Sequence, residues 1–300
     1  MLRHAHASAV APARVVVVGS GGFIGGAILR RVEADGVPTL PLTRAEVDLT
    51  APEAGARLAS MLQADDTLVF VSANAPCKDL GMLRENVVMA EAVCEALQRR
   101  PVVHAIYVSS DAVYADSPQP LTEHSAAEPG SLHGAMHLTR EIAMRGAHAG
   151  PLAIVRPTLV YGADDPHNGY GPNRFRRLAS AGEEIVLFGE GEERRDHVDV
   201  DDVAELVRLI AVHRSAGVAN AVSGQVASFR ELAELAAASF TPRVAVRGTP
   251  RAGEMPHGGF RPFDNRAVLE AFPGFVFKGW REGLGRLHAL TRDGGAGGTR

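Results

Sequence analysis

The apolar positions of this chain form short β-branched runs that alternate with longer amphipathic stretches. The runs predict strands at residues 14–18, 37–42, 67–71, 102–108 and 151–156. The stretches that follow them predict helices at residues 22–34, 52–63, 79–99, 132–148 and, after an interruption, 200–213. Because the strand runs are continuously apolar, both faces of the sheet are expected to be covered, which is typical of parallel sheets. The pattern therefore predicts an α/β fold of the doubly wound Rossmann type.

The alternation of strands and helices breaks down from about residue 162 to 195 and again after 225. We therefore expect a larger domain and a smaller C-terminal lobe. The larger domain would comprise residues 14–162 with about 196–224, and the lobe residues 163–195 and 225–290. Residues 1–13 lack periodicity and residues 291–300 are rich in glycine, so both ends are expected to be loosely held.

A glycine loop joins the first predicted strand to the first predicted helix. It reads Gly19-Ser-Gly-Gly22-Phe-Ile-Gly25 and has the spacing G-x-x-G-x-x-G. Glycine lets the backbone turn tightly and approach a pyrophosphate, and the helix N-terminus offers free N–H groups to the phosphate charge. The flanking strand and helix make this a predicted NAD or NADP site, contacted by Gly19, Gly22, Phe23, Ile24 and Gly25.

The end of the second predicted strand bears on the choice of cofactor. An Asp or Glu that binds the ribose hydroxyl of NAD would be expected there, but the strand ends with Leu42-Thr43-Arg44. An arginine favours the 2′-phosphate of NADP, which we slightly prefer over NAD; a solvated surface arginine is the alternative. Asp48 and Leu49 are expected at the edge of the adenine pocket, although Asp48 could instead cap a helix.

Further motifs follow in order along the chain: Ala73-Asn74-Ala75, Asn86, Val108–Tyr114, Arg156–Gly162, Arg195–Asp202 and Asn220–Gly224. Together with the glycine loop, they resemble the extended short-chain dehydrogenase/reductase family, the NAD-dependent epimerase/dehydratase group, from about residue 14 to 290. The resemblance implies a Rossmann sheet with a small C-terminal substrate lobe. It also implies cofactor contacts from the Ala73–Ala75 segment and from Asn86.

The resemblance implies a catalytic set of three groups. In the family a Ser or Thr polarises the substrate oxygen, a Tyr exchanges the proton, and a Lys four residues later lowers the pKa of that Tyr and holds the nicotinamide ribose. Ser110 stands in the first position, although a serine that ends a strand also commonly caps a loop. The helix that should carry Tyr and Lys has His133 and His137 in their places.

Several interpretations of this histidine pair remain open. His133 could exchange the proton, because an imidazole pKa of about 6.5 suits acid–base catalysis near neutral pH; His137 would then orient it or contact the cofactor ribose. The site could be degenerate, leaving a cofactor-binding protein with a regulatory or scaffold role. Histidines four residues apart can also bind a metal, but no acidic third ligand stands beside them and we expect no metal. Two exposed helix histidines without a function are the remaining alternative.

On the substrate side, the resemblance implies that Arg195 and Arg251 contact the diphosphate of a nucleotide-linked sugar. Guanidinium groups match phosphate oxygens bidentately, whereas surface ion pairs are the alternative for each. Asn173 is a further substrate-binding candidate, although helix capping explains it as well. The segment Thr43–Leu49 resembles that of 4-keto-sugar reductases. These features favour an NAD(P)-dependent oxidoreductase or epimerase of nucleotide sugars.

Composition mainly excludes other classes of protein. The 31 basic and 35 acidic residues give a formal net charge of −4, without a block of like charge, which argues against partners bound by bulk electrostatics such as nucleic acids or membrane surfaces. No apolar run approaches the roughly 18 residues needed to span a bilayer. Cys77 and Cys94 predict a reducing cytoplasm rather than a disulfide. The resemblance also implies a homodimer paired through residues 79–99 and 132–148.

Overall fold

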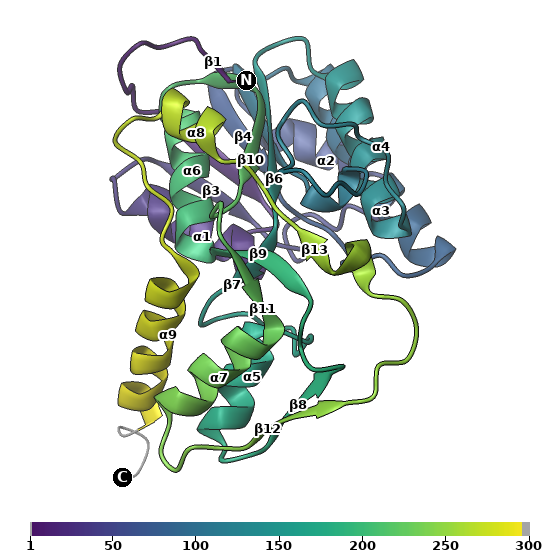
Figure 1. The fold of residues 1–300 in the computed structure, drawn as a ribbon. Helices are drawn as coiled ribbons and strands as arrows, with labels where there is room; N and C mark the ends of the chain where they lie inside the picture. The colour runs from purple at the N-terminus through teal and green to yellow at the C-terminus, as the bar shows by residue number, and fades with distance from the viewer. Residues whose placement is uncertain (1, 296–300) are drawn as a thin grey trace.

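The computed structural model describes residues 2–295, and it divides visibly into a sheet-centred upper part and a smaller lower lobe (Figure 1). The main sheet has seven strands. Their order across the sheet is β1 (Arg3–His4), β10 (Ser215–Ala221), β6 (Leu152–Pro157), β5 (His104–Val108), β4 (Asp66–Phe70), β2 (Arg14–Val18) and β3 (Thr39–Leu42). All neighbouring strands are parallel except β1 and β10, which are antiparallel. The predicted α/β Rossmann class is confirmed.

Helices cover both faces of this sheet. One face carries α1 (Phe23–Glu33) and α6 (Val200–Val212), and the other carries α2 (Ala54–Met61), α3 (Leu80–Arg99) and α4 (Leu132–Ala147). In β2, Val15 and Val17 belong to the first core whereas Val16 and Val18 belong to the second. A strand buried on both faces therefore explains the continuous apolar run. Every predicted strand and helix of this domain begins and ends within two residues of its expected bounds.

The order of the strands creates a crevice. β3 lies on one side of β2 and β4 lies on the other, so the chain reverses its direction across the sheet at β2. In open α/β sheets, ligands bind at the carboxyl ends of the strands beside such a switch point. The fold therefore locates a binding site where β2 meets the glycine loop and β4 ends.

The lower lobe has its own hydrophobic core, which includes Phe175, Leu187, Phe229 and Trp280. Its elements are α5 (Pro172–Ser180), β8 (Ile185–Phe188), α7 (Phe229–Ser239), β12 (Val246–Thr249) and α9 (Trp280–Gly295). A small sheet joins the lobe to the main domain, with β9 (Arg194–Asp199) pairing with β7 (Leu159–Tyr161), β11 (Val226–Ser228) and β13 (Phe260–Arg261). The short elements η1 (Asp111–Val113), η2 (Pro256–Gly259) and α8 (Arg266–Ala271) complete the fold.

Two features differ from the expected division of the chain. Residues 266–277 were expected in the lobe, but Val268, Phe272 and Phe275 pack into the α1–α6 core of the main domain. The other expected bounds of the main domain and the lobe stay a proposal. The described parts of both ends are also more ordered than glycine content and lack of periodicity indicated, because tertiary partners hold them. His4 in β1 contacts Ser215 and Phe272, and α9 continues through Thr291, which accepts a hydrogen bond from Arg176.

The predicted loose tail at 291–300 is thus helical up to Gly295, and residues 296–300 lie outside the described residues. The described helices, from α1 to α9, include none that is long and apolar enough to cross a membrane.

Candidate active site

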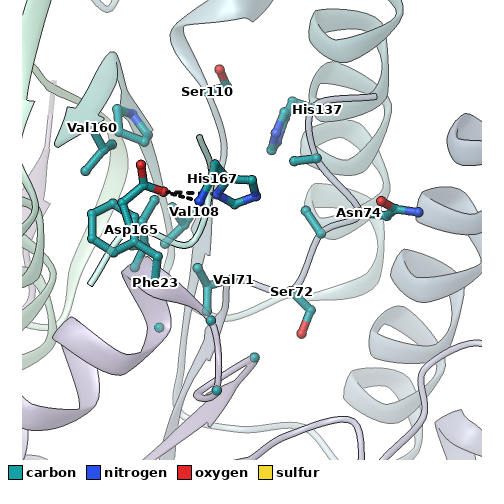
Figure 2. Close-up of a pocket in the computed structure, with 18 of the residues that line it drawn as sticks. Phe23, Val71, Ser72, Asn74, Val108, Ser110, His137, Val160, Asp165 and His167 are labelled. Carbon is teal, nitrogen blue, oxygen red and sulfur yellow. Dashed lines mark hydrogen bonds and ion pairs between the residues drawn. The ribbon is translucent and has the colours of Figure 1, made fainter. Parts of the chain in front are cut away.

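A cleft of about 960 Å³ opens at the carboxyl ends of β2, β4, β5 and β6. This volume lies near the upper end of the roughly 300–1,000 Å³ that is usual for small-molecule and cofactor sites. The cleft is lined by the glycine loop, by the segments that follow the sheet strands, and by the beginning of α5. Figure 2 shows Ser110 and His137 together at one end of the cleft and Ser72 at the other. The crevice beside β2, where the strand order reverses, is therefore a large cleft.

The glycine loop can approach a ligand because two of its positions exclude a side chain. Gly19 has φ +101°, and a Cβ there would lie 2.6 Å from Ser72 Oγ. A Cβ on Gly25 would lie 2.1 Å from the carbonyl oxygen of Gly19. Helix α1 begins after Gly22 with no side-chain cap and no acidic residue in its first turn. Its N–H groups are therefore available to an anion in the cleft, which Gly19, Gly22, Phe23, Ile24 and Gly25 all line.

We expect Gly25→Ala to weaken binding of NADPH or NADH by about 10- to 100-fold, as measured by calorimetry. The new Cβ must displace the carbonyl of Gly19, and losing one hydrogen bond to a phosphate costs roughly 1.5–3 kcal/mol. Gly146→Ala in α4 is the control, because the Cβ it would add meets no atom within 4 Å apart from the adjoining helix backbone. Unchanged cofactor binding by the Gly25 variant would contradict the role given to the loop.

Arg44, Asp48 and Leu49, which were expected near the adenine end of a cofactor, line the part of the cleft that follows β3. Arg44 Nε lies 3.2 Å from Asp48 Oδ2, and the Arg44 side chain is 74% exposed. Hydrogen bonds from Thr50 lower the pKa of Asp48, which keeps this partner negatively charged. The arginine thus has an acidic partner that the strand-end pattern did not reveal. An exposed ion pair of this kind is weak, so a phosphate can compete for Arg44.

The segment after β4 also lines the cleft, through Ala73, Asn74 and Ala75. Asn86 was expected to contact the cofactor as well, but it is fully buried in α3 and does not line the cleft. Its Oδ1 accepts a hydrogen bond of 3.0 Å from the Asn74 N–H, and its Nδ2 donates to the carbonyls of Asn74 and Met82. Both the oxygen and the nitrogen of the Asn86 side chain are thus hydrogen-bonded to backbone groups. Asn86 therefore positions the Asn74 loop instead of binding a ligand.

Ser110 and His133 are brought together by close packing of α4 on η1. Gly134 makes this possible, because a Cβ there would lie 1.9 Å from the Ala112 carbonyl oxygen. Ser110 Oγ accepts a hydrogen bond of 3.1 Å from the Ala112 N–H, and Ser110, His133 and His137 all line the cleft. Ser110 therefore caps η1 and also lines the cleft, and its contact with a substrate oxygen stays a prediction. The two histidine rings meet edge to face, with centroids 4.8 Å apart.

The hydrogen bonds and burial of this histidine pair favour neutral rings. The backbone N–H of Cys77 donates to His133 Nδ1 over 3.3 Å, so the neutral ring carries its proton on Nε2. Burial lowers the pKa of His133, although Asp111 opposes the shift. Burial, reinforced by His133 and Arg140, also lowers the pKa of His137 well below its ordinary value. Across residues 2–295, no group of three or more His, Cys, Asp or Glu side chains is arranged to hold a metal ion.

His137 contacts the buried Tyr107, and the buried Arg140 lies close enough to influence its charge. The Tyr107 hydroxyl lies 2.7 Å from His137 Nδ1. The Arg140 guanidinium lies 4.3 Å from the centroid of Phe70 and 5.4 Å from that of Tyr107, and its Nη2 donates to the Ser72 carbonyl over 2.6 Å. Arg140 thus places a buried positive charge one turn beyond His137.

Asn173 lines the cleft at the start of α5, but protein groups use its amide. The Gly162 N–H donates to its Oδ1 over 3.2 Å, and its Nδ2 donates to Asp165 Oδ2 over 2.7 Å. Asp165 also accepts from the backbone and ring of His167, which faces the cleft (Figure 2). Asn173 therefore orders the loop that presents His167, and its expected contact with substrate is replaced by this positioning role.

The two candidate substrate arginines lie beside the cleft and bind carboxylates in this structure. Arg195 Nη1 is 3.3 Å from Glu193, and its Nη2 is 3.9 Å from Asp111. Arg251 Nε is 3.2 Å from Glu192. Arg195 lies on β9 and Arg251 follows β12, and their partners Glu193 and Glu192 lie in the segment that joins β8 to β9. Neither lines the cleft itself, and their contact with a diphosphate stays a prediction.

Comparison with known proteins identifies the family of this chain. The family model described as "NAD dependent epimerase/dehydratase family" matches residues 15–223. The chain belongs to this family. Within it, the chain is 30% identical over 253 residues to GDP-L-fucose synthase 1 of Arabidopsis thaliana, covering 74% of this chain and 76% of that protein. It is 28% identical over 285 residues to the UDP-glucose 4-epimerase of Mycolicibacterium smegmatis, covering 81% and 88% respectively.

Solved structures support the fold of this epimerase/dehydratase family chain. A GDP-L-fucose synthetase from Naegleria fowleri bound to NADP superposes with a TM-score of 0.82, at 15% identity and with 99% of each chain covered. At this identity the likeness concerns the fold alone.

Four residues at or beside the site of this epimerase/dehydratase chain escaped prediction. Tyr107 lies in a continuous strand pattern, which predicts a core position. Arg140 lies in a helix pattern, which predicts a surface position. His167 lies in the irregular segment after residue 162, where no periodicity indicates which side chains face a ligand. Arg261 is only 1% exposed and binds Asp111 over 3.1 Å; the Pro-flanked sequence around it gave no sign of burial. Only the fold brings these side chains to the cleft and to Asp111.

Proposed function

We propose that this chain is an NAD(P)-dependent reductase of nucleotide-linked keto-sugars that prefers NADPH to NADH. The observation that carries the proposal is that Ser110 and the His133–His137 pair share one cleft with the uncapped N-terminus of α1. Relatives named as GDP-L-fucose synthases support the sugar class, and those named as 4-epimerases keep epimerisation open as the related reaction. Arg44 at the end of β3 supports the preference for the 2′-phosphate.

The cleft fits a dinucleotide on the chain's own geometry. Side chains are excluded at Gly19 and Gly25, which form a cradle for a diphosphate beneath the α1 N–H groups. Arg44 would hold the 2′-phosphate, and the Ala73–Ala75 segment would line the path toward His137. A bound nicotinamide supplies or accepts a hydride. The protein supplies the remaining chemistry, namely orientation of the sugar and transfer of a proton.

Ser110 and His133 act on the sugar oxygen in this proposal. The Ser110 hydroxyl, whose bond to Asp111 Oδ1 is long at 3.4 Å, can turn to donate to the carbonyl oxygen. A protonated His133, which takes the position of the family tyrosine, gives its Nε2 proton to that oxygen as the carbonyl is reduced, and the neutral ring accepts it in the reverse direction. Protonation of Nδ1 gives up the hydrogen bond from the Cys77 N–H, and the neutral ring regains that bond when its remaining proton exchanges with solvent to Nε2. His137, in the position of the family lysine, orients His133 and is itself held by Tyr107.

The charge state of the pair favours a second candidate function. His137 is neutral, so it lacks the positive charge that the family lysine provides. A cofactor-binding protein with a regulatory or scaffold role, which binds NAD(P) without turning it over, would have such a site. The two functions predict the same cofactor binding and differ in turnover.

The direct test is oxidation of NADPH and NADH with 4-keto-6-deoxy-hexoses linked to GDP, UDP and dTDP, followed by absorbance of the reduced nicotinamide. We expect oxidation with at least one of them, faster with NADPH, together with cofactor binding measured by calorimetry. Cofactor binding without turnover of any keto-sugar would favour the regulatory alternative. A chain that binds neither cofactor would overturn the proposal.

A further inference from the structure

His197 lies in the wall of the cleft and has a buried ring nitrogen without a partner. It lies on β9, its residue is 1% exposed, and it lines the cleft. Its Nδ1 lies 3.1 Å from the carbonyl oxygen of Arg195. Its Nε2 has no hydrogen-bond partner within residues 2–295. Because buried polar atoms nearly always have a partner, each such exception needs an explanation.

The hydrogen bond at Nδ1 determines what Nε2 can do. A carbonyl oxygen only accepts, so the proton of the neutral ring lies on Nδ1 and Nε2 carries a lone pair. Burial and the nearby Arg195 charge lower the pKa of His197 to about 3, which keeps a second proton off the ring. His197 therefore places a hydrogen-bond acceptor in the cleft wall, whereas neutral His133 carries an Nε2–H donor.

Position separates His197 from the other buried histidines that have a ring nitrogen without a partner. His104, His148 and His288 also have a ring nitrogen without a partner in the described part of the chain. None of these three lines the cleft, and His197 does. Its backbone is paired with Leu159 of β7, another cleft residue, and its ring meets Phe229 edge to face at 5.7 Å. The pairing of β7 with β9 and the contact with Phe229 therefore hold the ring in the cleft wall.

We propose that His197 Nε2 accepts a hydrogen bond from an O–H or N–H group of the ligand that fills this cleft, and so helps to select that ligand. Two ligand groups have this chemistry, a hydroxyl of the sugar and the carboxamide N–H of the nicotinamide. The inference rests on the proposed function, because it takes the cleft to be the site of cofactor and nucleotide sugar.

The test compares three variants of the full chain. His197→Phe keeps a ring of similar size and removes the acceptor. His197→Gln restores an acceptor oxygen near the position of Nε2. His288→Phe is the matched control, since His288 is 1% exposed and also has an unpartnered Nε2, but it lies in the core of the lower lobe beside Phe240.

Calorimetry then measures binding of NADPH alone, and of GDP-, UDP- and dTDP-linked hexoses to the cofactor-saturated protein. We expect His197→Phe to weaken one of these two steps by about 5- to 10-fold, the effect of one hydrogen bond. His197→Gln should recover part of the loss, and His288→Phe should bind like the wild type. Loss at the NADPH step assigns the carboxamide as the donor, and loss at the sugar step assigns a hydroxyl.

Melting temperatures separate binding from folding. We expect the two Phe variants to shift in melting temperature alike, with only the His197 variant losing affinity. Wild-type binding of both ligands by His197→Phe would overturn the inference and leave the proposed function standing. A wild-type chain that binds neither ligand would overturn both.

If His197→Phe does not fold, ¹⁵N spectra of the wild-type imidazoles decide the matter. Ligand should then move the His197 Nε2 resonance toward that of a hydrogen-bonded acceptor. An unmoved resonance in the saturated protein would count against the inference.

Discussion

Replacing His133 by alanine is expected to lower kcat for keto-sugar reduction by roughly 100- to 10,000-fold, the usual contribution of a positioned acid or base. Cofactor affinity should be unchanged, because the glycine loop that would hold the diphosphate is made by a different part of the chain. Steady-state kinetics and calorimetry on the same preparation measure the two effects. His124→Ala is the control, since His124 is exposed and lies outside the cleft.

The pH dependence of the reaction distinguishes a proton donor from a structural histidine. Burial lowers the pKa of His133, so the protonated fraction of this ring is small at neutral pH and grows as the pH falls. Reduction needs the protonated ring, and kcat/KM should therefore rise as the pH is lowered through the neutral range. The His133→Ala variant should lose this rise. A variant with the wild-type rate and pH profile would show that the proton comes from another group.

Replacing Glu141 by alanine is expected to lower the free energy of unfolding by about 3–5 kcal/mol, because it leaves a buried charge without its partner. Glu141 binds Arg156 through two hydrogen bonds of 2.8 and 2.6 Å, and the two side chains are 1% and 5% exposed. Ser109 Oγ also donates to Glu141 over 2.7 Å. Chemical denaturation measures the loss. The same change should reduce activity, because Glu141 ties α4 to the ends of β5 and β6.

Two comparisons identify the cause of this destabilisation. Removing both charges in the Glu141→Leu, Arg156→Met double variant should recover most of the stability, because replacing a whole buried pair by apolar side chains is often neutral. Glu184→Ala removes an exposed partner of Arg247 and should cost about 0–1 kcal/mol. If Glu141→Ala costs no more than Glu184→Ala, the buried pair does not hold α4 to the sheet.

The sequence by itself determined the elements of the main domain and the location of the glycine loop. These are local properties of the chain. A run such as Val15–Val18 must be buried on both faces, and each residue of it is, in one core or the other. The glycine loop could be recognised because its geometry requires glycine itself. Gly25 allows a close approach of the backbone, and Gly19 adopts a positive φ.

Only the tertiary structure decided what the polar side chains of the site do. Asn86 and Asn173 are of the types that bind ligands, yet their amide groups are used by backbone and by Asp165. His197 is the opposite case, since an ordinary position in a strand became an acceptor without a partner in the cleft. The physical reason is that hydrogen bonding in a packed interior depends on which groups are brought together from distant parts of the chain. Residue type and spacing show which hydrogen-bonding groups the chain contains. Packing decides which of these groups remain free to bind a ligand.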